Sequence, residues 1–196
     1  MSQSLPPAVI LAGGLSRRMG GGDKCLQHLA GRPILSHVMG RLSPQVDALA
    51  LNANGDPSRF DQFDLAVLAD PLPDYPGPLA GVLAAMEWAA RSGAPRVITV
   101  SADVPFLPND LVARLTGSGP AACYARSYGR DHPTIGVWPV SAAEGLRDYL
   151  MAGNRRVLQW VQSLDAQPVD FTGNPDPFLN INTPEDLANA TRLHAL

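Results

Sequence analysis

The feature that most constrains the fold is a short apolar run near the start of the chain, followed at once by a glycine-rich, cationic segment. Residues 8–12 read Ala-Val-Ile-Leu-Ala, and residues 13–24 contain five glycines, two arginines and a lysine. A continuous apolar run that enters a glycine turn is typical of a strand buried on both faces of a parallel sheet. A helix is expected next, because Pro33 precedes apolar residues at helical spacing.

The same alternation continues along the chain and predicts a Rossmann-like, three-layer α/β fold with a mostly parallel sheet. The second half is less regular, with a strand pair whose turn is expected at residues 129–131 and a last helix that begins at Pro184. The predicted strands are 8–12, 47–52, 65–69, 96–101, 121–126 and 133–138, and the predicted helices are 79–90, 109–115, 141–151 and 156–163.

Length and charge limit the class of protein. With 196 residues, of which 45% are hydrophobic, the chain is expected to form a single domain spanning residues 1–196. A net charge of -3 gives no basic face for nucleic acid or for an anionic membrane. Two cysteines in no metal-ligand spacing, and no targeting or membrane-spanning run, predict a cytoplasmic protein.

The glycine-rich segment has the composition of a loop that binds phosphate. Glycines let backbone N–H groups approach an anion closely, and Arg17 and Lys24 can contact phosphate oxygens with charge-assisted hydrogen bonds. The segment is not a Walker A loop, because Asp23 and Cys25 flank the lysine where that motif has Gly and Ser or Thr. It also lacks G-x-G-x-x-G, which disfavours a dinucleotide-binding enzyme.

A second candidate site lies where the predicted strand 96–101 ends. Asp103 follows this β-branched strand and stands two residues before Pro105. Ligands of open α/β sheets bind outside the carboxyl ends of the strands, so an aspartate there is well placed to hold Mg²⁺ that bridges nucleotide phosphates. We therefore expect Mg²⁺ as the cofactor and Asp103 as its ligand.

Together these segments resemble the MobA-like nucleotidyltransferases, the family of the molybdenum cofactor guanylyltransferases. The resemblance rests on L-A-G-G-x-S-R-R-M-G-x-x-D-K at residues 11–24 and S-A-D-V-P-F at 101–106. Further similar stretches span nearly the whole chain in the expected order, at residues 32–33, 51–54, 70–71, 74–81, 130–134, 155–157 and 180–185. The resemblance implies a fold of the nucleotide-diphospho-sugar-transferase type.

The resemblance also implies the reaction and its residues. GMP from GTP would be joined to the terminal phosphate of molybdenum-molybdopterin, with release of pyrophosphate. The N-terminal half would bind GTP and the C-terminal half the pterin. Arg17, Lys24 and Asp103 would be catalytic; the GTP contacts would be Leu11, Ala12, Gly13, Lys24, Asn52, Asp70 and Asp103; and the molybdopterin contacts would be Arg155, Arg156, Asn180 and Asn182. A monomer is expected, and molybdoenzyme apoproteins or their chaperones would receive the product.

Three other functions remain open from the residues. A molybdenum cofactor cytidylyltransferase would tend to read L-A-A-G in the first loop, where this chain has Gly13 and so more room for a purine. A sugar-phosphate nucleotidyltransferase would share the fold but lack the stretches at 130–133 and 155–156. A non-catalytic molybdopterin-binding chaperone would take up GTP without releasing pyrophosphate.

For three other features the sequence does not decide between a structural and a functional role. The stretch 76–81 is either a plain loop-to-helix junction or a helix start that faces an anionic ligand, and the resemblance favours the second. His132 either contacts substrate or shapes its loop, because a phosphate nucleophile needs no base. Cys25 has no evident role.

Overall fold

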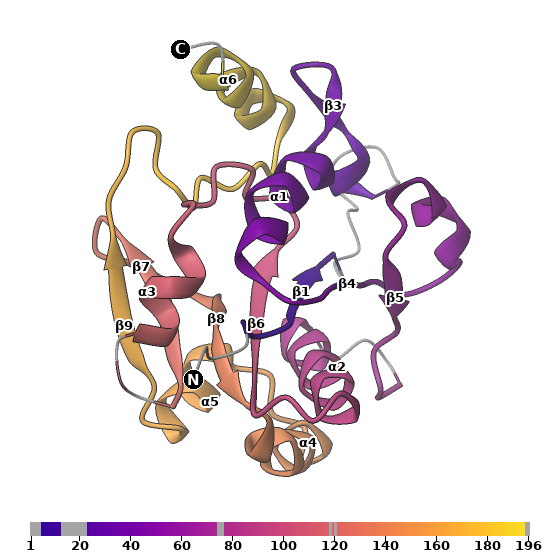
Figure 1. Cartoon of the computed structure of the whole chain (residues 1–196), viewed down its shortest axis with the longest axis vertical. Coiled ribbons are helices and arrows are strands. Elements are labelled where there is room, and N and C mark those ends of the chain that lie inside the picture. Colours follow the sequence, from indigo (N-terminus) through magenta and orange to yellow (C-terminus); the bar gives the residue numbers. More distant parts are fainter. Residues whose placement is uncertain (1–4, 13–22, 74–76, 118, 120, 195–196) are drawn as a thin grey trace.

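The computed structural model describes residues 5–12, 23–73, 77–117, 119 and 121–194. A seven-stranded sheet with the order β5-β4-β1-β6-β8-β7-β9 forms its centre (Figure 1). The strands are β1 (Ala8–Leu11), β4 (Leu49–Asn52), β5 (Ala66–Leu68), β6 (Arg96–Ser101), β7 (Cys123–Ser127), β8 (Arg130–Pro139) and β9 (Gln167–Phe171), with a separate hairpin of β2 (His28–Leu29) and β3 (Arg32–Pro33). The helices are α1 (Ile34–Leu42), α2 (Pro78–Arg91), α3 (Leu111–Gly117), α4 (Ala143–Met151), α5 (Val157–Ser163) and α6 (Pro184–His194), with 3-10 helices η1 (Lys24–Leu26), η2 (Ser43–Gln45), η3 (Pro57–Phe63) and η4 (Val140–Ala142).

The sheet is mostly parallel, as predicted. Strands β5, β4, β1 and β6 run parallel to one another, whereas β8 is antiparallel to both β6 and β7. Strand β9 then pairs in parallel with β7 and forms the edge. The α/β fold class is therefore confirmed, and the reversed strand β8 joins the residues of the second half to the parallel sheet of the first.

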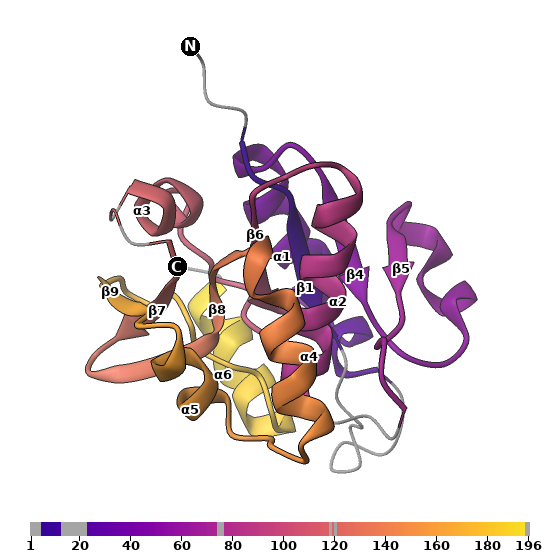
Figure 2. The same cartoon turned by 90° about the horizontal axis from the view of Figure 1, so that it is seen from below.

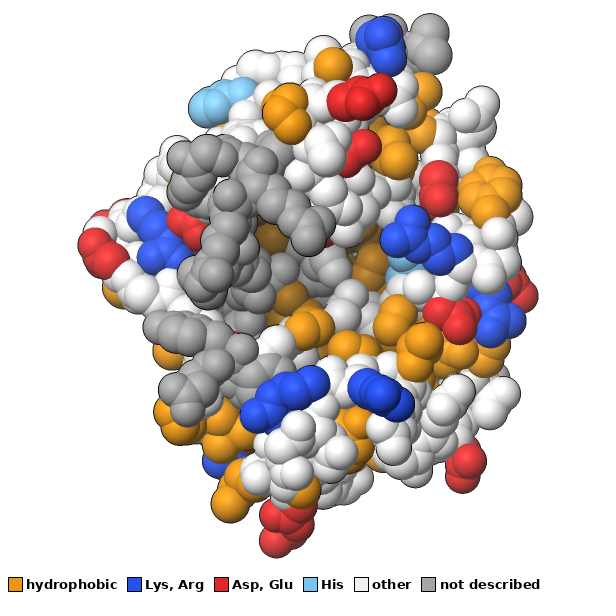
Figure 3. All heavy atoms as spheres, turned by 180° about the vertical axis from the view of Figure 1, so that it is seen from behind, with side chains coloured by type: hydrophobic (Ala, Val, Ile, Leu, Met, Phe, Trp, Pro, Cys, Tyr) orange, Lys and Arg blue, Asp and Glu red, His pale blue; other side chains and the backbone are white. Residues whose placement is uncertain are grey.

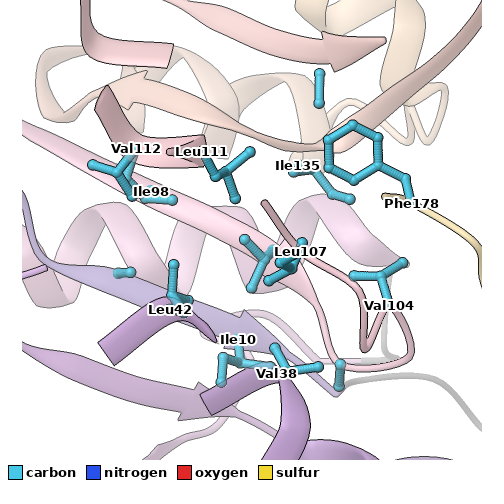
Figure 4. Close-up of a cluster of buried hydrophobic side chains, with 14 of the residues drawn as sticks. Ile10, Val38, Leu42, Ile98, Val104, Leu107, Leu111, Val112, Ile135 and Phe178 are labelled. Carbon is cyan, nitrogen blue, oxygen red and sulfur yellow. The ribbon is translucent and has the colours of Figure 1, made fainter. Parts of the chain in front are cut away.

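The apolar run of β1 is buried on both faces because helices cover both sides of the sheet. Ile10 packs in a cluster with the apolar faces of α1 and α3, and its neighbour Val9 packs against α2 on the opposite face. Both side chains are fully buried. Figure 4 shows the first cluster, with Ile10 among Val38, Leu42 and Leu107. Helices α4 and α5 join α2 on the second face, which completes the three layers (Figure 2).

Two helices begin in ways that bear on the site. Helix α2 starts at Pro78 after Gly77, whose φ of +91° is a backbone conformation that favours glycine. Before α6, Asp186 accepts hydrogen bonds from the backbone N–H groups of Asn182 and Thr183, and its own N–H donates to Thr183 Oγ1. This capping box fixes the segment that leads into the helix, and α6 then packs on the β2–β3 hairpin (Figure 1).

Several local predictions are wrong. The turn between β7 and β8 lies at Tyr128 and Gly129, both with positive φ, so Arg130 and Asp131 already belong to β8. Pro33 ends β3 instead of opening α1. The β2–β3 hairpin, η3 and β9 are not anticipated at all.

Candidate active site

The carboxyl ends of β1 and β6 meet at the middle of the sheet, where the chain order reverses. Strand β1 lies between β4, which is the next strand of this sheet in the chain, and β6. Such a switch point is where open α/β sheets bind ligands. Lys24, which follows β1, and Asp103, which follows β6, lie 79 residues apart in the chain but form an ion pair with 2.5 Å between Nζ and Oδ2.

The C-terminal segment before α6 completes this centre. Lys24 Nζ also donates to Asn182 Oδ1 at 2.7 Å, although 158 residues separate them. The Ile181 N–H donates to the Asp103 carbonyl oxygen at 3.0 Å, and the Ile181 side chain is fully buried. Because the capping box holds the Asn182 backbone, the lysine amine is fixed between a carboxylate and an amide.

Two buried side-chain oxygens at this centre have no hydrogen-bond partner among the described residues. They are Asp103 Oδ1 and Asn180 Oδ1, from the two segments that the Ile181–Asp103 hydrogen bond joins. An unsatisfied buried acceptor is costly unless a ligand completes it, and carboxylate and amide oxygens are ligands of hard divalent cations. Among the described residues no group of three His, Cys, Asp or Glu side chains could hold a metal ion, so a cation here would depend on substrate phosphates and water for its other ligands.

A second polar cluster lies at the ends of β4 and β5. Both carboxylate oxygens of Asp70 accept amide hydrogen bonds, one from Asn52 Nδ2 at 2.9 Å and one from Asn54 Nδ2 at 2.7 Å. Asn52 is only 2% exposed, and its amide lies so close to Gly81 of α2 that a Cβ there would be 2.3 Å from Asn52 Oδ1. Asn52 therefore lies behind Asp70, and Asp70 is the more accessible of the two predicted nucleotide contacts.

Of the other predicted nucleotide contacts, Leu11 and Ala12 have backbone groups that are already hydrogen-bonded within the protein. The Ala12 N–H donates to Asn52 O at 2.9 Å and the Leu11 carbonyl accepts from Ala102 N–H, so the sheet already uses these backbone groups. Gly13 and Arg17 lie outside the described residues.

The two predicted pterin arginines lie between α4 and α5 and are exposed. Arg155 Nη1 donates to the carbonyl oxygens of Leu150 and Asn154, both at 2.7 Å. In the described part of the chain neither arginine forms a hydrogen bond or ion pair with Lys24, Asp103 or Asn182. Arg156 also lines a shallow groove with Val157, Leu158, Gln159 and Gln162 of α5. Lys and Arg side chains are scattered over the face in Figure 3, outside its grey atoms, beside a band of hydrophobic ones.

Cys25 and His132 are two titratable side chains that could be considered as a nucleophile or a base. Burial, with the nearby charge of Asp23, raises the pKa of the Cys25 thiol to about 12, so the thiol stays protonated. His132 Nε2 lies 2.9 Å from Ser127 Oγ, its ring packs on Phe178, and burial lowers its pKa. Neither side chain is set up as a nucleophile or a base by these contacts.

Sequence reasoning missed the partners of two site residues. Asn54 completes the Asp70 cluster. Its position two residues after Asn52, at the end of a predicted strand, could have indicated this contact. Asp23, directly before Lys24, forms an ion pair with Arg59 of η3, with 2.5 Å between Oδ2 and Nε. No sequence pattern connects these two charges.

A doubly wound sheet with a lysine, an aspartate and two asparagines at its switch point has the architecture of the α/β proteins that bind a ligand at the carboxyl ends of their strands. The model of the MobA-like NTP transferase domain matches residues 8–168. The chain belongs to this family and is a nucleotidyltransferase, which confirms the resemblance found in its motifs.

Within the family the chain groups with the molybdenum cofactor guanylyltransferases. It is 50% identical to that of Bradyrhizobium sp. (strain ORS 278), with 97% of this chain and 93% of the relative covered. It is 47% identical to that of Nitrobacter hamburgensis, with 100% and 99% covered.

Solved structures confirm the fold of the nucleotide-diphospho-sugar-transferase type. Molybdopterin-guanine dinucleotide biosynthesis protein A from Archaeoglobus fulgidus superposes with a TM-score of 0.75 at 22% identity, over 96% of this chain and 98% of that one. A 4-diphosphocytidyl-2C-methyl-D-erythritol synthase from Anaerococcus prevotii gives 0.74 at 14% identity, over 98% and 97%. The fold is therefore shared by enzymes with different products and does not fix the substrate.

Proposed function

We propose that the chain transfers GMP from GTP to the terminal phosphate of molybdenum-molybdopterin and releases pyrophosphate. The names of its relatives support the transferred guanylyl group and the molybdenum cofactor as acceptor. The observation that carries the proposal is the arrangement of Lys24, Asp103 and Asn182 at the switch point, beside the unpartnered oxygens of Asp103 and Asn180.

The reaction needs alignment and charge neutralisation more than acid–base chemistry. A phosphate oxygen of the pterin attacks the α-phosphorus of GTP, and the bond to the bridging oxygen of pyrophosphate breaks as that group leaves with the electron pair. The nucleophile is already an anion, so no side chain has to remove a proton. This agrees with the structural surroundings of His132 and Cys25.

Lys24 is the cation for the departing pyrophosphate. In the free protein its amine is shared between Asp103 and Asn182, so phosphate oxygens entering the centre exchange one acceptor for another without moving the amine far. Arg17 is proposed to act beside it. A positioned donor of this kind is most effective where charge develops in the transition state.

Asp103 and Asn180 are the proposed ligands of a divalent cation, Mg²⁺, through their unpartnered oxygens. When bound, the ion neutralises phosphate oxygens and stabilises the charge that develops at the α-phosphate. The Lys24 amine pairs with the Asp103 carboxylate, so this side of the centre carries one charge of each sign.

The two substrates are proposed to approach from different sides. Asp70, held by Asn52 and Asn54, lies on the nucleotide side together with Leu11, Ala12 and Gly13, and Arg155 and Arg156 lie on the pterin side. Asn180 and Asn182 would stand between the substrates, since Asn182 touches Lys24. The protein is proposed to act in the cytoplasm as a monomer and to deliver its product to molybdoenzyme apoproteins or their chaperones.

Pyrophosphate release with molybdenum-molybdopterin and each nucleoside triphosphate in turn tests the function. GTP should support turnover and CTP should not. Equal or better use of CTP would identify a cytidylyltransferase, and release only with a sugar phosphate as acceptor would identify the other enzyme class. Binding of GTP without any release would indicate a carrier protein.

Asp103→Asn, which keeps the size of the side chain but removes its charge, should lower kcat on the order of 100-fold or more. Asp110→Asn is the matched control, because Asp110 is exposed and pairs only loosely with Arg114 at 3.9 Å. Near-normal turnover in folded Asp103→Asn protein would remove this carboxylate from the mechanism.

A further inference from the structure

Arg59 joins the two polar clusters of the site. Its Nε lies 2.5 Å from Asp23 Oδ2, its Nη1 donates to Asp56 O at 2.8 Å and its Nη2 to Asn54 O at 2.5 Å. Asp23 directly precedes Lys24, and the Asn54 side chain binds Asp70. A continuous path of contacts thus runs from the lysine at the end of β1 to the carboxylate at the end of β5.

The surroundings of Arg59 hold its guanidinium in one position. It lies over the ring of buried Phe60, with 4.7 Å from Cζ to the ring centroid. The chain also turns around it at Gly55, which has a φ of +85°, and a Cβ on Gly55 would lie 3.1 Å from Nη1. The turn and the Phe60 ring therefore both lie in contact with the guanidinium and restrict where it can move.

The contact between Arg59 and Asp23 is electrostatic and not an aligned hydrogen bond. Among the described residues Arg59 Nε has no aligned hydrogen-bond acceptor, although the Asp23 carboxylate lies within ion-pair distance. Burial is the main cause that raises the pKa of the Cys25 thiol, the Asp23 and Asp103 charges raise it further and Arg59 lowers it, so the three charges share one neighbourhood. An unpaired carboxylate in that neighbourhood would repel a nucleoside triphosphate.

We propose that Arg59 is a positioning residue for nucleotide binding: it holds Asp23, fixes the direction of Lys24, and cancels a carboxylate charge beside the phosphate site. The inference rests on the proposed function, because it takes the nucleotide to bind at Lys24 and Asp103. Arg59 itself touches no reacting atom.

The first test is a steady-state comparison of Arg59→Met with the wild type. The KM for GTP should rise about tenfold, within the range found for residues that share one network, while the KM for molybdenum-molybdopterin stays unchanged. A purely structural role would reduce the active fraction and so lower the apparent kcat with both KM values unchanged, which would overturn the proposal.

A second variant separates charge from packing. Adding Asp23→Asn to Arg59→Met removes the carboxylate that the arginine neutralises, so the double variant should have a lower KM for GTP than Arg59→Met alone. A double variant that is no better than the single one would overturn the proposal. Arg147→Met is the matched control, because Arg147 pairs with Glu87 between α4 and α2 with similar exposure, and its KM values should equal those of the wild type.

A third measurement needs no turnover. Cys25 follows Lys24 in η1 and is 4% exposed, whereas Cys123 lies fully buried in β7. Backbone amide hydrogen exchange, followed by peptide mass spectrometry, should be faster in Arg59→Met for the peptide that contains Cys25, because Leu26 N–H donates to the Asp23 carbonyl oxygen in this turn, and unchanged for the peptide that contains Cys123. Unchanged exchange in the Cys25 peptide, or faster exchange in both peptides, would overturn the proposal.

The wild-type assay keeps the two proposals apart. If the wild type releases no pyrophosphate from GTP, the proposed function fails. If the wild type turns over and Arg59→Met has an unchanged KM for GTP, only the role of Arg59 fails.

Discussion

Arg155 and Arg156 are neighbours in the chain but differ in what their guanidinium groups already bind. Arg155 caps the C-terminal end of α4 through the carbonyl oxygen of Leu150 and also donates to the carbonyl oxygen of Asn154 in the following loop. In the described residues the Arg156 side chain has no hydrogen bond or ion pair, and it borders the groove along α5. Arg156 is therefore the better candidate for the pterin phosphate, since a free guanidinium can bind an anion with two parallel hydrogen bonds.

We expect Arg156→Ala to raise the KM for molybdenum-molybdopterin about tenfold, as for the loss of one charge-assisted hydrogen bond. Arg155→Ala should instead destabilise the fold by about 1 kcal/mol, because two carbonyl oxygens lose their donor. Steady-state kinetics and urea unfolding of both variants check this division. The reverse result, with Arg155→Ala alone affecting the KM, would contradict it.

The pairing of Lys24 with Asp103 could be predicted, because each follows a buried strand and parallel strands end along the same edge. The contact of Asn182 with Lys24 could not, because Asn182 follows no strand and its position depends on how the last segment packs. The contacts of Arg59 could not be predicted either, because in the sequence a single arginine in a short 3-10 helix cannot be distinguished from any exposed charge.

At the scale of elements, α2 approaches β4 at Gly81, where the Asn52 amide occupies the space of a side chain. This contact lets the helix backbone lie against the strand end and holds Asn52 toward Asp70. A glycine inside a helix costs about 1 kcal/mol relative to alanine, so its presence here is explained by the close approach.

Gly81→Ala should lower the free energy of unfolding by about 1 to 3 kcal/mol, because the new Cβ must displace Asn52, and the gain in helix propensity offsets only part of this. Gly40→Ala in α1 is the matched control, since nothing lies within 4 Å of its Cβ position. That variant should be more stable than wild type by up to about 1 kcal/mol. Urea unfolding measures both, and equal stability of the two variants would refute the packing argument.

Strands buried on both faces were predictable, whereas the edge strand β9 was not. Strands β1 and β6 could be recognised in the sequence as apolar runs, because both of their faces are buried. Strand β9 contains Pro168 and Asp170, which argue against a strand in the interior of a sheet but are tolerated at an edge. Pro133 lies inside β8 where the pairing with β7 shifts register, so a proline that suggests a strand boundary marks an irregularity instead.

For the whole molecule, two histidines link stability to pH. Burial is the main cause that lowers the pKa of both His37 and His132 from the ordinary value of 6.5. His37 donates from Nε2 to the Leu29 carbonyl oxygen at 2.8 Å, and the charges of His194 and Arg32 also disfavour its protonation. Below pH 6.5 the unfolded chain therefore takes up protons that the folded chain resists, so stability falls as the pH decreases.

We expect the urea midpoint to drop between pH 7.5 and pH 5.5, since both imidazoles contribute stability only above their unfolded pKa. The double variant His37→Gln/His132→Gln should lose most of this pH dependence, whatever its absolute stability. His28→Gln, at an exposed position, should keep it. A double variant as sensitive to pH as the wild type would show that other groups cause the effect.

The hydrogen bond between Ile181 and Asp103 has a consequence for how the protein is made. Ribosomes synthesise a chain from its N-terminus, and the strands from β1 to β9 emerge before the segment that carries Asn180 and Asn182. A nascent chain arrested before residue 180 could assemble its sheet but would hold Lys24 without its amide partner and the Asp103 carbonyl without its donor. The candidate centre is thus complete only after residues 180–182 have been synthesised, and products that terminate before residue 180 should be inactive even when their sheet has formed.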